Sequence, residues 1–152
     1  MNPSGAIGKD FFVQLSKEGS KLNLSFSGYE VFDNIIMALD GINRKLLLMH
    51  CNDFKREPVI LPLGEKLNVS VKKTYSGIPA GGLRYKSLDA FVDKIVMEFE
   101  LSDNPTKAMV PVFDAAFNQP GDRAKLEKKA RNWQQLLMKL SGRNQHKTVE
   151  QG

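Results

Sequence analysis

The sequence is poor in the residue types that most often build catalytic and metal sites. Among 152 residues there is one cysteine, Cys51, and there are two histidines, His50 and His146. A single cysteine excludes an intramolecular disulfide and suits a reducing compartment. Two distant histidines and one cysteine do not make a zinc site. We therefore expect neither a metal nor a cofactor.

Long apolar runs are also missing. A membrane-spanning helix needs about 20 consecutive apolar residues, and the longest candidate, residues 35–51, is interrupted by Asp40, Asn43, Arg44 and Lys45. The first residues, 1–5, lack the basic-then-apolar layout of a signal peptide. These patterns predict a cytoplasmic protein without a membrane partner.

Catalytic motifs are weak. His50 and Cys51 are adjacent in sequence, but neighbouring residues rarely form a nucleophile–base pair, and a buried structural thiol is the better interpretation. The glycine-rich stretch 77–82 lacks the Gly-Lys-Ser/Thr end of a nucleotide-binding loop.

Acidic residues suggest one catalytic alternative, a magnesium-dependent nuclease built around Asp89 and Asp93. Glu98 and Glu100 follow, but on a strand they share a face with Lys94, which is typical of a solvated sheet surface. We expect the protein not to be an enzyme.

The net charge of +5 lies entirely in the last 32 residues. Residues 1–120 hold 14 basic and 14 acidic side chains, whereas residues 121–152 hold eight basic and three acidic ones. A localised cationic surface indicates a polyanionic partner, most often nucleic acid.

Hydrophobic spacing predicts an α+β fold: a mostly antiparallel sheet packed on one long helix, followed by two C-terminal helices. A β-hairpin is expected over residues 11–26. Ser27 and Glu30 fit a capping box, and apolar residues then recur at intervals of 3 and 4, which predicts a helix from about Gly28 to Met49. A coiled-coil dimer seam is the alternative for this segment.

The second half of the chain predicts strands and then helices. Residues 59–61 suit an edge strand because Pro58 and Pro62 flank them. Residues 67–71 and 93–101 alternate as strands. Pro111 is expected to open a short helix, and Asp122 to cap a final helix that Gly142 ends.

Two basic segments are candidate binding surfaces. The first is residues 72–86, read as a hairpin whose two sides each place a tyrosine beside two cations. Cations neutralise phosphates and tyrosine rings stack on unpaired bases, so this pattern slightly favours single-stranded DNA or RNA. Its residues are Lys72, Lys73, Tyr75, Arg84, Tyr85 and Lys86.

The second segment is the final helix. Its cations lie off the apolar stripe: Lys125, Lys128, Lys129 and Arg131. This helix has two further interpretations: it docks on a partner protein through Trp133, Leu137 and Leu140, or it lies on an anionic membrane. The membrane interpretation is the weakest because the apolar face is short.

These observations predict a flexible start at 1–8, an α+β core at 9–120, a basic amphipathic helix at 121–142 and a disordered tail at 143–152. The expected function is that of a non-catalytic nucleic-acid-binding accessory protein, with a single strand slightly favoured. The alternative is a protein–protein adaptor or assembly subunit, including a homo-oligomer, that docks through the C-terminal helix.

Overall fold

The computed structural model describes residues 3–51, 56–64, 67–78, 80–84, 87–102 and 104–142. The chain divides into two compact units, Met1–Gly64 and Glu65–Gly152. The first consists of helix α1 (Pro3–Leu22) and strands β1 (Gly28–Phe32), β2 (Ile35–Asp40), β3 (Lys45–His50) and β4 (Val59–Pro62). The second consists of strands β5 (Leu67–Tyr75), β6 (Val92–Leu101) and β7 (Asn104–Asp114), helix α2 (Arg123–Leu140) and the 3₁₀ turns η1 (Gly82–Arg84), η2 (Leu88–Phe91) and η3 (Pro120–Asp122).

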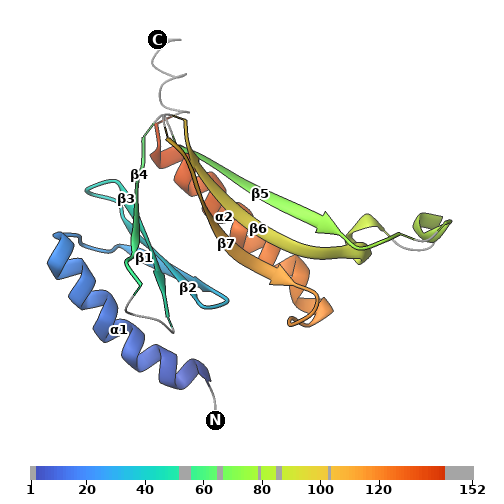
Figure 1. Cartoon of the computed structure of the whole chain (residues 1–152), viewed down its shortest axis with the longest axis horizontal. Helices are drawn as coiled ribbons and strands as arrows, with labels where there is room; N and C mark the ends of the chain where they lie inside the picture. The colour runs from blue at the N-terminus through green and yellow to red at the C-terminus, as the bar shows by residue number, and fades with distance from the viewer. Residues whose placement is uncertain are drawn as a thin grey trace. The chain divides into compact units, whose positions relative to one another are not determined.

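In the first unit, α1 lies against an antiparallel sheet of order β1-β2-β3-β4 (Figure 1). Leu15 of α1 joins a buried cluster with residues of β2 and β3 and with the residue that follows β3: Ile36, Ala38, Leu47, Met49 and Cys51. β4 is an edge strand, as its flanking prolines predicted.

The hairpin predicted over residues 11–26 is wrong, because α1 occupies most of that segment. The polar residues 16–21, which resemble a turn, lie within this helix. A Cβ at Gly19 would lie 3.1 Å from a ring carbon of Phe26, so a larger residue there would push the returning chain outward by a few tenths of an ångström. Asn23, in the left-handed region (φ 61°), ends the helix, and the Leu24 N–H donates to the Gly19 carbonyl at 2.8 Å.

The predicted long helix over Gly28–Met49, with its coiled-coil alternative, is also wrong. The segment forms three antiparallel strands, joined by a two-residue turn at Asp33–Asn34 and a four-residue turn after Asp40. Ile42, a member of the predicted apolar stripe, is 86% exposed in the second turn. All six residues of β2 are buried, which is why its apolar run is continuous rather than alternating.

The proposed capping box does not form, because Ser27 precedes a strand. Its hydroxyl donates to the Leu39 carbonyl at 3.2 Å. The turn after β2 is instead organised by the buried carboxylate of Asp40, which accepts hydrogen bonds from the Ser25 amide and from the amide and side chain of Asn43, all at 2.7–2.8 Å.

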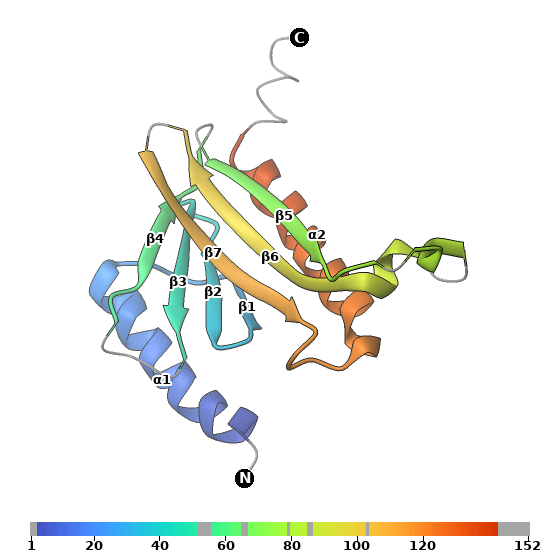
Figure 2. The ribbon, with the colours of Figure 1, turned by 45° about the vertical axis from the view of Figure 1, so that its right-hand side comes forward.

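In the second unit, α2 lies along one face of an antiparallel sheet of order β5-β6-β7 (Figure 2). The alternation predicted for β6 is confirmed: Ile95, Met97 and Phe99 are buried, whereas Val96 and Glu98 between them are partly exposed.

The expectation of two C-terminal helices is wrong, because Pro111 lies within β7. β7 is an edge strand and its register shifts beside this residue, so the missing amide hydrogen is tolerated. The final helix is confirmed. Asp122 precedes it but makes no side-chain capping bond, and Gly142 follows it with φ 89°.

Candidate nucleic-acid interface

One side of α2 is exposed, and it carries lysines and amides. Lys128, Asn132, Gln135 and Lys139 lie at i, i+4, i+7 and i+11, so they form one row along the helix, with Lys125 beside it. We call these five residues the outer row. All five are exposed, and Ala130 and Leu137, on the opposite side, are fully buried.

The outer row is uniformly basic or neutral. At a rise of about 1.5 Å per residue, Lys128 and Lys139 lie about 16 Å apart along the axis. Within the described part of the chain, Lys125, Lys128 and Lys139 form no ion pair. The one acidic residue of α2, Glu127, is turned toward the sheet and is largely buried.

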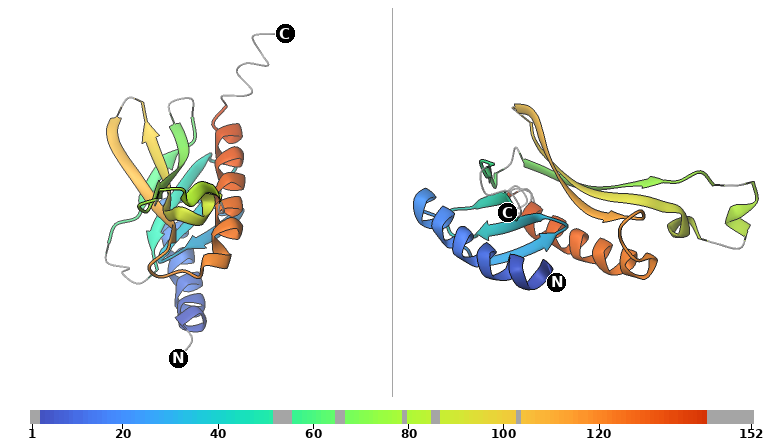
Figure 3. Two further views of the ribbon diagram at one scale, coloured as in Figure 1. Left: turned by 90° about the vertical axis from the view of Figure 1, so that its right-hand side faces the viewer. Right: turned by 60° about the horizontal axis from the view of Figure 1, so that its bottom comes forward.

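Polar contacts hold α2 on the sheet. The Gln134 side-chain amide donates to the Val69 carbonyl of β5 at 2.9 Å. The Lys73 ammonium of β5 lies 3.0 Å from a Glu127 carboxylate oxygen, and both side chains are more than four-fifths buried. Figure 3 shows the helix following one face of the β5–β7 sheet in two further views. The orientation of the outer row is therefore set by the packing of the helix.

The Glu127 carboxylate forms ion pairs with three cations: Lys73, Arg123 and Arg131. Its burial opposes ionisation, but the hydrogen bonds from Lys73 and Arg131 outweigh burial and lower its pKa. The Glu127 hydrogen bond in turn raises the pKa of Lys73. Lys73 and Arg131 were predicted to contact phosphates, and both are instead engaged within the unit.

Lys72, another predicted phosphate contact, is engaged on the other face of the sheet. Its ammonium lies 3.1 Å from a Glu98 oxygen, and Lys107 of β7 reaches the same oxygen at 3.3 Å. The hydrogen bond from Lys72 lowers the pKa of Glu98. These ion pairs link side chains of all three strands, so the positive charges on this face are largely balanced by carboxylates.

The predicted basic hairpin over residues 72–86 does not form as two facing strands. In the register of β5 with β6, Lys72 lies opposite Val96 and Lys73 opposite Ile95. Tyr75 ends β5 and is 39% exposed, and Arg84 lies in η1. Tyr85 and Lys86 lie outside the described residues. The described residues therefore do not support a facing pair of tyrosines that stacks on bases.

The remaining predicted residues lie on the flank and buried side of α2. Lys129 is partly exposed. Trp133 and Leu140, predicted as partner-docking residues, are partly buried, and Leu137 is fully buried. A side chain with no exposed surface cannot contact a partner without unfolding of the helix.

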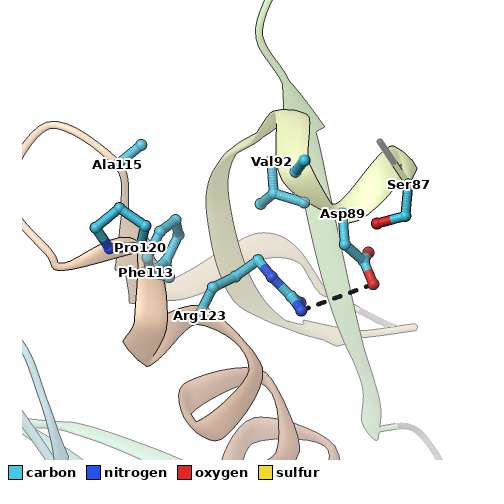
Figure 4. Close-up of a pocket in the computed structure, with 8 residues that line it drawn as sticks. Ser87, Asp89, Val92, Phe113, Ala115, Pro120 and Arg123 are labelled. Carbon is cyan, nitrogen blue, oxygen red and sulfur yellow. Dashed lines mark ion pairs between the residues drawn. The ribbon is translucent and has the colours of Figure 1, made fainter. Parts of the chain in front are cut away.

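A pocket of about 310 Å³ opens near the N-terminal end of α2 (Figure 4). Asp89 and Arg123 face each other at 3.7 Å on its wall, beside the apolar side chains of Val92 and Phe113. Asp89 also lies 3.3 Å from the Lys73 ammonium. This carboxylate, considered as a magnesium ligand with Asp93, is thus held by two cations.

The sequence raised two other kinds of chemical site, a metal site and a reactive thiol at Cys51. Within the described ranges, no three His, Cys, Asp or Glu side chains gather as a metal site would require. Cys51 is buried, and its burial raises the pKa of the thiol, which disfavours the nucleophilic thiolate. No helix in the described part of the chain has the length and apolar character needed to span a membrane.

Two outer-row residues, Asn132 and Gln135, were missed at the sequence level. The signal was available, since the apolar spacing of 126–140 already defines the opposite, exposed side. Both side chains are neutral, so charge patterning does not indicate them.

No known protein family, curated protein or solved structure matches this chain.

Proposed function

We propose that this protein is a non-catalytic nucleic-acid-binding accessory protein and that it contacts phosphates through the outer row of α2. The observation that supports this function is the exposure of Lys125, Lys128 and Lys139 on one rigidly held helix side that carries no carboxylate. Lysines in such a row attract a polyanion, and nothing within the described unit neutralises them.

The number of cations in the outer row lowers the expected salt dependence of binding. The eight cations named from the sequence would give a slope of log K against log salt of about −7 on duplex DNA, at about −0.9 per neutralised phosphate. Three lysines give a slope of about −2.7. Binding then weakens about 40-fold between 50 and 200 mM salt.

Fluorescence anisotropy with a labelled DNA duplex, titrated over this salt range, tests the proposal. We expect Lys128→Ala to weaken binding and to reduce the slope by about 1. Lys94→Ala is the matched control, because Lys94 is an exposed lysine of β6 away from α2. Absence of binding at low salt, or an equal loss in both variants, would reject the outer row as the binding surface.

The adaptor alternative makes the opposite prediction, because an apolar contact responds little to salt. Its proposed stripe is weakened by the complete burial of Leu137. Partner capture that persists at high salt and is lost on substitution of Trp133 would favour the adaptor.

A further inference from the structure

The outer row offers hydrogen-bonding groups as well as positive charge, because two side-chain amides lie between its lysines. Asn132 and Gln135 are exposed and three residues apart, with Lys128 one turn before the pair and Lys139 one turn after it. A side-chain amide presents a donor and an acceptor together. This combination matches the acceptor N7 and the donor N6 that adenine shows in the major groove.

We propose that α2 enters the major groove of B-form DNA, where Asn132 and Gln135 read adenine edges while Lys128 and Lys139 bind flanking phosphates. This inference rests on the proposed function. A helix with its side chains is about 10–12 Å across, and the major groove is about 12 Å wide, so the outer side of one helix fits.

Base reading requires a helix that does not roll, because a bidentate amide contact tolerates little misorientation. α2 meets this requirement through three contacts on its inner side: the Gln134 bond to the Val69 carbonyl, the pair of Lys73 with Glu127, and the buried Leu137. These contacts lie on the side opposite the outer row, so binding leaves them intact.

Duplex DNA fits this surface better than the other nucleic acids. The major groove of duplex RNA is too deep and narrow to admit side chains. Binders of single strands use aromatic rings as stacking platforms, and the outer row contains none. The amides therefore favour a B-form duplex over the single strand that the sequence suggested.

Anisotropy with three labelled DNA duplexes of equal length tests the inference. One contains only A·T pairs, one only G·C pairs, and the third replaces adenine in the A·T duplex by 7-deazaadenine. The third keeps base pairing and charge but lacks the N7 acceptor. We expect tighter binding to the A·T duplex, by between about 5-fold and 150-fold for one bidentate contact, and loss of this preference with 7-deazaadenine.

The variants Asn132→Ala and Gln135→Ala should reduce the A·T preference, because they should weaken binding to the A·T duplex more than binding to the G·C duplex. Asn68→Ala, at an exposed asparagine of β5, is the matched control and should change neither. Equal binding to all three duplexes, tighter binding to a single strand, or unchanged preference in both amide variants would overturn the inference and leave the proposed function standing. Absence of binding to any nucleic acid at low salt would overturn both.

Discussion

The adjacent leucines of α2, Leu136 and Leu137, provide a direct test of which side of the helix is exposed. Leu137 is fully buried, whereas Leu136 is 40% exposed. Leu→Ala removes three carbon atoms, each worth about 0.8 kcal/mol when fully buried. For Leu137 this is about 2.4 kcal/mol, and the cavity left in the core raises the cost to about 3 kcal/mol. For Leu136 we expect about 1 kcal/mol, since the side chain is partly in water already.

Urea unfolding followed by the fluorescence of Trp133 measures this difference. Trp133 is the one tryptophan of the chain and lies in α2, so its signal reports on the second unit. For an m-value of about 1.5 kcal/mol/M, Leu137→Ala should lower the midpoint by about 2 M, and Leu136→Ala by less than 1 M.

Leu137→Met separates packing from general damage to the helix. It keeps the side-chain volume, so it should cost less than about 1.5 kcal/mol. Equal losses for Leu136→Ala and Leu137→Ala, or a larger loss for Leu136→Ala, would refute the packing of α2 and with it the position of the outer row.

Two further predictions concern carboxylates. The amide hydrogen bonds from Asn43 and Ser25 lower the pKa of Asp40 to about 2. Because the pKa of Asp40 is lower in the folded than in the unfolded chain, its ionised carboxylate stabilises the fold above about pH 4, and this stabilisation is lost as the pH falls toward 2. The difference in urea midpoint between wild type and Asp40→Asn, followed by circular dichroism, should therefore be constant above about pH 4 and shrink toward pH 2. A difference that does not change with pH would contradict this prediction. Glu127→Gln should destabilise the second unit by about 1–2 kcal/mol in the Trp133 assay. Glu100→Gln, at an exposed pair, should cost less than about 1 kcal/mol, and the reverse order would be inconsistent with the buried pair.

Local pattern was sufficient where one element has one dominant periodicity. α2 and β6 were predicted because a long amphipathic stripe and a strict alternation each fit a single structure. The helix predicted for residues 28–49 was wrong because the apolar runs of this segment are continuous, and such runs fit a helical stripe as well as fully buried strands. The turn residues at Asp33–Asn34 would have decided between them, but the regular spacing of 3 and 4 outweighed that signal.

The binding surface was predicted only in part, for a tertiary reason. The cationic character of α2 is local and visible in the sequence. The neutralisation of Lys72 and Lys73 cannot be read from the sequence. Their carboxylate partners, Glu98, Asp89 and Glu127, lie 16 or more positions away and contact them only in the folded unit. Packing thus removed cations from the expected surface and left the lysines of one helix side.

Two triple variants with the same net charge test whether the outer row of α2 is the binding surface. The first replaces Lys125, Lys128 and Lys139 of the outer row by glutamine; the second replaces Lys17, Lys45 and Lys94, which are exposed elsewhere. The measurement is the affinity for a labelled DNA duplex at 50 mM salt. We expect the first variant to lose nearly all binding and the second to retain most of it. Equal losses would show that binding follows net charge, and would contradict the proposal that the outer row of α2 is the binding surface.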